Sequence, residues 1–172
     1  MEESSVDRLS RKKLPLDGDK FSIAPLSLLL VEDHEANRIL AKMVLARGQH
    51  TIIEANNGLG ALEMLVKHDI DTILMDVQMP VMDGLTATRI IRQAEKGEPL
   101  KEVGEGLAGQ LSQRLQGGHV PILAMTASAM TEDRERYLQA GMDDYLSKPF
   151  KIDEVGLALQ KISSSPEVPK KS

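Results

Sequence analysis

The sequence contains no cysteine and no tryptophan, and aromatic residues make up only 2% of its 172 residues. Without cysteine, the chain cannot form disulfides, iron–sulfur clusters, thiolate zinc sites or a cysteine nucleophile, and a reducing compartment is compatible with it. The scarcity of aromatic side chains argues against a base-stacking surface for nucleic acid. It also predicts a core built from aliphatic residues and methionine.

Long hydrophobic runs and an excess of positive charge are also missing. The apolar stretch 28–31 is far shorter than the roughly 20 residues of a membrane helix, and the N-terminus lacks the hydrophobic region of a signal peptide. A net charge of −5 and a pI near 5.4 give no general attraction to DNA or to anionic membranes. We therefore expect a cytoplasmic protein with no direct contact to nucleic acid and no membrane contact by this segment.

Composition divides the chain into three parts. Residues 1–25 are polar, mixed in charge and without a period, which predicts a linker or a disordered N-terminal tail. Residues 163–172 combine serine, proline and lysine, which predicts a flexible C-terminal tail. The overall 41% of hydrophobic and 27% of charged residues fit one globular domain, which we place over residues 26–162.

Within this domain, short apolar runs alternate with segments of helical period, as is typical of βαβ units and a parallel sheet. Several runs are too uniformly apolar for a sheet with one solvated face, so helices must cover both faces. The fold class is therefore α/β, with a doubly wound, five-stranded parallel sheet. The expected strands are Leu26–Val31, Thr51–Glu54, Thr72–Met75, Val120–Met125 and Asp144–Ser147.

The first expected helix carries an apolar stripe that we predict to face the sheet. The stripe consists of Ala36, Ile39, Leu40, Met43 and Val44.

Residues 96–119 are too long for an ordinary connection and are expected to be an insertion. Val103, Leu107, Leu111 and Leu115 recur at every fourth position there, which predicts a short amphipathic helix. This helix either packs on the domain's own surface or binds a partner.

Polar residues follow four of the five expected strands. Glu32 and Asp33 follow the first strand, Asp76 the third, Thr126 the fourth and Lys148 the fifth. Ligands of open α/β sheets collect at this edge, and three converging carboxylates require a cation, for which oxygen ligands select Mg²⁺, Mn²⁺ or Ca²⁺. A carboxylate nucleophile, a divalent cation and a lysine together are suited to phosphoryl chemistry. Each residue alone has a structural explanation, as a helix cap or a surface charge, but their joint occurrence favours function.

The segments LLLVEDHEANR, ILMDVQMPVMDGL, PILAMTASA and AGMDDYLSKPF resemble response-regulator receiver domains, most closely those of hybrid sensor histidine kinases. The resemblance covers about Leu26–Ile162 and is interrupted only by the insertion. It implies a flavodoxin-like strand order 2-1-3-4-5, with the inserted helical segment before strand 4. It also implies a phosphoacceptor domain of a two-component phosphorelay, which takes its phosphoryl group from a phosphohistidine.

The resemblance further implies roles for the residues at the strand ends. Asp76 matches the phosphoacceptor, and Lys148 matches the lysine that pairs with the phosphate. Glu32 and Asp33 match the acidic pair that holds Mg²⁺ together with Asp76 and the backbone carbonyl of Gln78.

Three further positions match the switch of the family. Thr126 matches the switch hydroxyl, Ala127 the small residue beside the phosphoryl site, and Tyr145 the aromatic residue that turns inward on activation. Pro149 would follow a cis peptide bond.

The implied partner is a histidine kinase or a histidine phosphotransfer protein, and a weak homodimer stays open. The chain is either part of a hybrid histidine kinase or a stand-alone regulator. Such a domain catalyses only its own phosphorylation and dephosphorylation, so whether the parent chain is an enzyme also stays open. Two other functions compete: a phosphorylation-independent binding module that uses the insertion, and a small-molecule phosphohydrolase. The hydrolase would require an aspartate at position 78, where the chain has Gln78.

Overall fold

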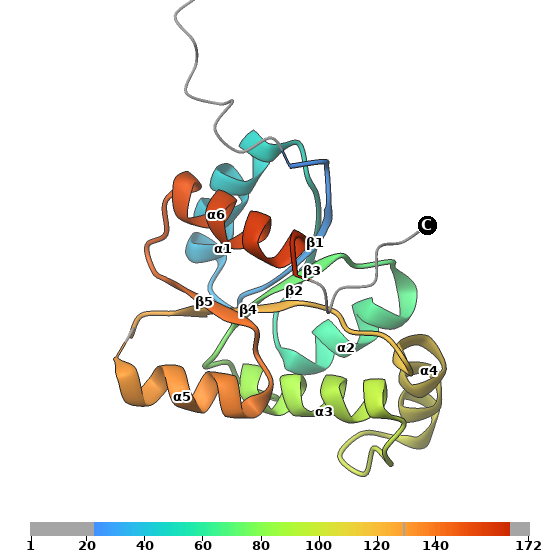
Figure 1. Cartoon of the computed structure of the whole chain (residues 1–172). Helices are drawn as coiled ribbons and strands as arrows, with labels where there is room; N and C mark the ends of the chain where they lie inside the picture. Colours follow the sequence, from blue (N-terminus) through green and yellow to red (C-terminus); the bar gives the residue numbers. More distant parts are fainter. Residues whose placement is uncertain (1–22, 129, 166–172) are drawn as a thin grey trace, which may run out of the picture.

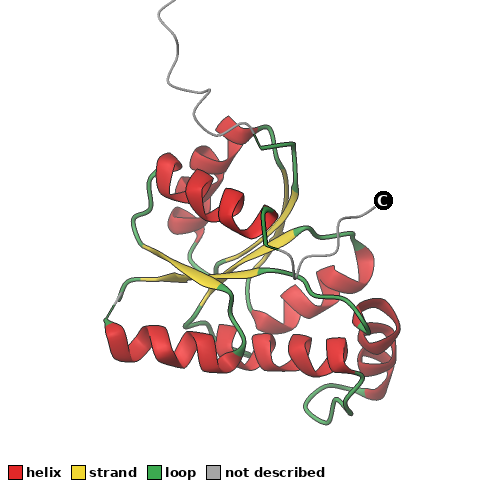
Figure 2. Cartoon of the chain, viewed as in Figure 1, coloured by secondary structure: helices red, strands yellow, loops and turns green. Residues whose placement is uncertain are grey.

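The computed structural model describes residues 23–128 and 130–165. Most of the expected N-terminal tail, residues 1–22, and residues 166–172 of the expected C-terminal tail lie outside this part. Five parallel strands form one sheet in the order β2-β1-β3-β4-β5, which confirms the predicted order (Figures 1 and 2). The strands are β1 (Ser27–Val31), β2 (Thr51–Ala55), β3 (Thr72–Asp76), β4 (Ile122–Thr126) and β5 (Asp144–Ser147).

Helices cover both faces of the sheet because strand side chains alternate between two apolar cores (Figure 1). In β1, Leu28 and Leu30 pack under α1 and α6, whereas Leu29 and Val31 belong to the core under α2, α3 and α5, and all four are fully buried. Within the described residues, no helix is long and apolar enough to cross a membrane. The helices of the five repeats are α1 (Glu35–Leu45), α2 (Gly58–Lys67), α3 (Gly84–Lys96), α5 (Thr131–Ala140) and α6 (Ile152–Ser163), and a short 3-10 turn (Ala46–Gly48) follows α1.

The prediction for the buried face of α1 is wrong for four of its five residues, and only Val44 packs, partly buried, against the core. The buried side chains of α1 are Ala41 and Leu45, whereas Ile39, Leu40 and Met43 are 51%, 60% and 65% exposed. Apolar residues occur around much of this helix, so its period alone could not identify the buried face. The result is an exposed apolar patch on α1, formed by Ile39, Leu40 and Met43.

The insertion contains one helix, α4 (Glu105–Leu115), which confirms the predicted helical segment before β4. Leu111 is fully buried, and Leu107 and Leu115 pack partly buried against the core under α2 and α3. The backbone N–H of Gly117 donates to the carbonyl of Glu95 at 2.9 Å and closes the base of the insertion. The apolar side of α4 is therefore directed at the domain itself.

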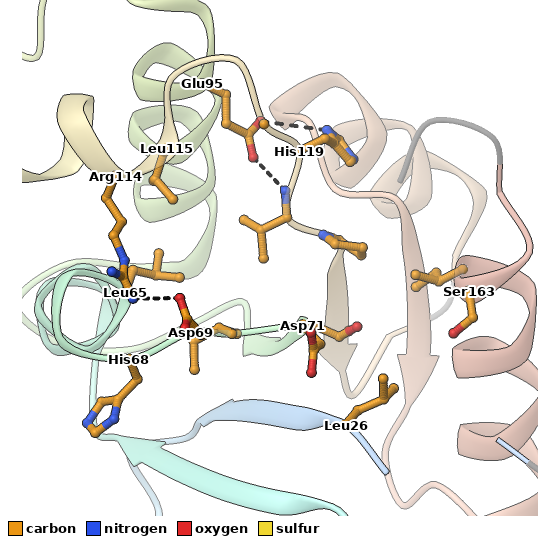
Figure 3. Close-up of a pocket in the computed structure, with 16 residues that line it drawn as sticks. Leu26, Leu65, His68, Asp69, Asp71, Glu95, Arg114, Leu115, His119 and Ser163 are labelled. Atoms are coloured by element: carbon orange, nitrogen blue, oxygen red, sulfur yellow. Dashed lines mark hydrogen bonds and ion pairs between the residues drawn. The ribbon is translucent and has the colours of Figure 1, made fainter. Parts of the chain in front are cut away.

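The insertion also borders a pocket of about 460 Å³ (Figure 3). The pocket lies at the amino-terminal edge of the sheet, opposite the edge that carries Asp76. Arg114 of α4 pairs with Asp69 at 2.8 Å, and Glu95 accepts a hydrogen bond from the backbone N–H of Val120 at 2.7 Å. These contacts fasten the insertion to the domain at a distance from the strand-end carboxylates.

Glycine weakens α4 without serving its packing. Gly109 lies inside the helix, is exposed, and has open space where a Cβ would be. Gly109→Ala should therefore raise the free energy of unfolding by about 0.5–1 kcal/mol, because alanine lowers the conformational entropy of the unfolded chain. Urea unfolding measures this change. Gly141→Ala is the control that should destabilise, because Gly141 ends α5 at a φ of +105°. A less stable Gly109→Ala variant would contradict the placement of this helix.

Candidate functional site

The pairing of the strands brings their polar ends to one edge of the sheet. Val31 at the end of β1 is paired with Met75, and Asp76 at the end of β3 is paired with Met125. Thr126 closes β4 one residue later. Because all strands are parallel, the residues that follow them emerge side by side at this carboxyl edge.

Lys148 joins two of the three carboxylates. Its Nζ lies 2.6 Å from Oε2 of Glu32 and 3.1 Å from Oδ1 of Asp76. Glu32 is 1% and Asp76 7% exposed, so both carboxylates are largely removed from water. The Lys148–Pro149 peptide bond is cis, as the resemblance implied, and the backbone N–H of Lys148 donates to the carbonyl of Thr126 at 2.7 Å. The backbone of the lysine is thus tied to β4, and its side chain is tied to Asp76 of β3 and to Glu32, which directly follows β1.

This arrangement shifts two pKa values. Burial raises the pKa of Asp76; Lys148 opposes the increase, and the charges of Glu32 and Asp33 add to it. Burial alone would lower the pKa of Lys148, but its contacts with Glu32 and Asp76 outweigh that effect, so the pKa of Lys148 is raised overall. Lys148 therefore stays charged at neutral pH.

Asp33 and His34 form the more open side of the site. The Asp33 side chain is 20% exposed, and its Oδ1 lies 3.1 Å from Nδ1 of His34. Glu32, Asp33 and His34 each offer a ligand atom within 4.8 Å of the others, the geometry of a potential cation site. The His34 side chain is 72% exposed, so this side of the site is open to solvent.

The turn after Asp76 returns the chain closely over β3. The backbone N–H of Gly84 donates to the carbonyl of Val77 at 2.9 Å, and a Cβ on Gly84 would overlap the carbonyl oxygen of Asp76. Asp83 caps α3 by accepting a hydrogen bond from the backbone N–H of Thr86 at 2.7 Å. Glycine at position 84 thus allows α3 to begin directly against the backbone of Asp76.

The remaining predicted site residues do not pair with Asp76 in the described part of the chain. The hydroxyl of Thr126 lies 2.8 Å from the phenolic oxygen of Tyr137, and the ring of Tyr145 lies 4.8 Å below the guanidinium of Arg134. Gln78 and Ala127, which are both exposed, lie in the loops that follow β3 and β4. The site roles assigned to these residues stay predictions.

Three side chains that hold the site together were not predicted from the sequence. Arg38 donates to the backbone carbonyl of Glu32 at 3.0 Å and thereby fixes the acidic loop from α1. Tyr137 and Arg134, both on α5, contact the two predicted switch residues. None follows a strand, and only the packing of α1 and α5 on the sheet brings them to this edge.

Comparison with known proteins gives one consistent answer. The sequence model of the response regulator receiver domain family matches residues 28–103 and 103–160. Histidine kinase 5 of Arabidopsis thaliana is 37% identical, over 78% of this chain and 15% of that protein. Hybrid signal transduction histidine kinase I of Dictyostelium discoideum is 37% identical, over 73% of this chain and 6% of that protein. The chain therefore spans only a small part of these relatives.

Solved structures agree in fold. One is the receiver domain of a sensor histidine kinase from Pseudomonas aeruginosa with a magnesium ion coordinated in its active site cleft. It superposes on this chain with a TM-score of 0.62 and 36% sequence identity, and the match covers 82% of this chain and 100% of that one. Another is the receiver domain of a Saccharomyces cerevisiae response regulator in complex with a histidine phosphotransfer protein. It superposes with a TM-score of 0.67 and 27% sequence identity, and the match covers 85% of this chain and 94% of that one. The chain belongs to the response regulator receiver domain family and is homologous to the receiver domains of hybrid histidine kinases.

Proposed function

We propose that this receiver domain accepts a phosphoryl group on Asp76 from a phosphohistidine of a partner protein. The observation that carries the proposal is the buried contact of Asp76 with Lys148, which also binds Glu32. A carboxylate, a fixed ammonium and further acidic oxygens at one edge of a parallel sheet provide a nucleophile and the charges that stabilise a transferring phosphoryl group.

The transfer requires one bond to form and one to break. A carboxylate oxygen of Asp76 forms a bond to phosphorus while the bond from phosphorus to the imidazole nitrogen breaks, and the bonding electrons return to that nitrogen. Lys148 neutralises negative charge on the equatorial oxygens. Water then hydrolyses the acyl phosphate, which restores the carboxylate. The domain thus catalyses only its own phosphorylation and dephosphorylation.

The donor set of the site fits Mg²⁺. Glu32, Asp33 and Asp76 would hold the ion together with the backbone carbonyl of Gln78, and oxygen ligands of this kind select hard divalent cations. The contacts of the Lys148 ammonium with Glu32 and Asp76 support this fit, because they show that the carboxylates already favour a positive charge. Bound Mg²⁺ supplies positive charge to the phosphoryl oxygens.

The exposed apolar patch on α1 supports a protein as the phosphodonor. Ile39, Leu40 and Met43 lie on the helix that begins directly after the acidic loop, so a protein docked on them would reach the phosphoacceptor edge. Such a donor would be a histidine kinase or a histidine phosphotransfer protein. After phosphorylation, Thr126 and Tyr145 would rearrange and change the surface that the next partner reads.

The biological setting belongs to the same proposal. We assign the domain to residues 26–162, with the insertion at 96–119, a linker over residues 1–25 and a flexible tail over 163–172. The resemblance to hybrid kinases supports a parent chain of that kind in the cytoplasm. The acidic net charge supports partners other than nucleic acid or membrane.

Phosphorylation by a small donor tests the function. Incubation of the purified chain with Mg²⁺ and acetyl phosphate should add a single phosphate, visible in the intact mass and removed by hydroxylamine, which cleaves acyl phosphates. The same reaction in EDTA should leave the mass unchanged. Failure with several phosphodonors would support the phosphorylation-independent binding module, whereas steady turnover of many phosphate esters would support a hydrolase.

A further inference from the structure

The hydroxyl of Thr126 is fully engaged in the unphosphorylated protein. Its Oγ1 lies 2.9 Å from the carbonyl oxygen of Ser128, 3.1 Å from the backbone nitrogen of Ser128 and 2.8 Å from the phenolic oxygen of Tyr137. A threonine hydroxyl can donate one proton and accept two. When Thr126 donates to the carbonyl of Ser128 and accepts from Tyr137 and from the Ser128 N–H, all three capacities are used. A new acceptor must therefore displace an existing partner.

Tyr137 is well placed to resist that displacement. It is 5% exposed, it is the buried residue of α5, and its ring belongs to the core under that face of the sheet. Within the described residues, its hydroxyl has one hydrogen bond, to Thr126. If Thr126 turns away, a buried phenolic hydroxyl loses its partner, which is unfavourable.

The same helix also holds the second predicted switch residue. Arg134 lies one turn before Tyr137 on α5, and its guanidinium stacks 4.8 Å above the ring of Tyr145 on β5. The remainder of α5 is mostly polar and exposed, and its other large apolar residue, Leu138, is 57% exposed, so the attachment of α5 to the domain depends strongly on Tyr137. One turn of α5 therefore contacts both Thr126 and Tyr145.

We propose that Tyr137 is a positioning residue that holds the Thr126 hydroxyl in a hydrogen-bond set competing with the phosphoryl group, and that it thereby couples Thr126 to α5. The inference rests on the proposed function. A phosphoryl group on Asp76 offers three acceptor oxygens. Thr126 can donate to one of them only by releasing the carbonyl of Ser128, and this movement withdraws the acceptor from Tyr137. The buried anchor of α5 then loses its polar contact, and the helix is free to shift.

The test uses the full chain, Mg²⁺ and beryllofluoride, a phosphoryl mimic that coordinates a carboxylate oxygen reversibly and without phosphoryl transfer. Its dissociation constant is measured by NMR titration for wild type and Tyr137→Phe. Phenylalanine keeps the ring and removes the hydroxyl that favours the unphosphorylated arrangement. The variant should bind beryllofluoride about threefold to tenfold more tightly, the equivalent of one net hydrogen bond.

Two backgrounds separate this coupling from a general effect on packing. In the Thr126→Ala background, the additional Tyr137→Phe substitution should leave the dissociation constant of beryllofluoride unchanged, because the Thr126 hydroxyl through which Tyr137 acts is already absent. In Thr126→Ser, which keeps the hydroxyl, Tyr137→Phe should again tighten binding. An equal gain in the Thr126→Ala background would overturn the inference.

The remaining outcomes distinguish the inference from the proposed function. Beryllofluoride binding by wild type, with unchanged or weaker binding by Tyr137→Phe, overturns the role of Tyr137 and leaves phosphorylation of Asp76 standing. A wild-type chain that binds no beryllofluoride and takes no phosphate from acetyl phosphate overturns both.

Discussion

Lys148→Met is expected to lower the free energy of unfolding at neutral pH by about 3 kcal/mol. Methionine keeps much of the length of the lysine side chain and removes its charge. Glu32, which is 1% exposed, would then keep a hydrogen bond from the backbone N–H of His34 but lose the ammonium 2.6 Å from its Oε2. A buried carboxylate without its counter-charge is costly, and Asp76 loses the same partner. Urea unfolding in EDTA measures the loss.

A second substitution identifies the cause. Glu32→Gln in the Lys148→Met chain should restore most of the stability, because the neutral amide needs no counter-charge. Lys161→Met is the matched surface control, since Lys161 is 77% exposed and its pairing with Asp144 at 3.3 Å should contribute less than about 1 kcal/mol. If Lys148→Met had the same free energy of unfolding as the wild type, Lys148 would not be the charge that balances the carboxylates of Glu32 and Asp76.

The pH dependence of this loss has a defined sign. The pKa of Lys148 is raised in the folded protein, because the carboxylate contacts outweigh burial. A group with a raised folded pKa contributes its full stabilisation below its unfolded pKa of 10.5 and loses it as the pH rises through the folded value. The deficit of Lys148→Met should therefore persist from about pH 7 to pH 9 and decline only in strong alkali.

Asp76→Asn is expected to abolish phosphorylation by acetyl phosphate while stabilising the metal-free protein. The amide cannot act as the carboxylate nucleophile, so incorporation should fall to background. Burial raises the pKa of Asp76, and Glu32 and Asp33 add to this increase against the opposing effect of Lys148. An acid with a raised folded pKa costs stability once it ionises, so removal of its charge should stabilise the fold at pH 7.

The same linkage predicts where the gain disappears. The wild-type protein loses stability as the pH rises from 3.8, the ordinary pKa of an aspartate, through the raised pKa of Asp76. The gain in free energy of unfolding from Asp76→Asn should therefore vanish below pH 3.8. Intact mass measures phosphate, and urea unfolding in EDTA at several pH values measures stability. Asp69→Asn, at a 79% exposed position, is the control that should phosphorylate normally. Phosphate retained by Asp76→Asn would place the acceptor elsewhere.

The sequence predicted the elements that short-range patterns determine. Short apolar runs such as Ile73–Met75 became buried strands, and the leucine spacing of the insertion produced α4. Most of the buried face of α1 was predicted wrongly, because apolar residues at 39–41 and 43–45 satisfy more than one helical stripe. Which stripe is buried depends on how α1 packs beside α6, and no pattern within the helix encodes that packing.

The residues of the site likewise fall into those that the sequence predicted and those that it did not. Residues that directly follow strands, such as Asp76 and Lys148, could be placed together because parallel strands end at one edge. Tyr137 and Arg38 could not, because their positions depend on how α5 and α1 pack on the sheet. The partners of Thr126 are likewise a property of the assembled fold, since Tyr137 is 11 residues further along the chain.

The α1 patch and helix α5 lie on opposite faces of the sheet (Figure 1). A protein seated on Ile39, Leu40 and Met43 leaves α5 uncovered, and a protein that grips α5 leaves that patch free. Under the proposed function, a phosphodonor protein bound to this patch and a downstream protein bound to α5 would occupy separate faces of the domain. Both proteins could then bind at the same time and form a ternary complex with it.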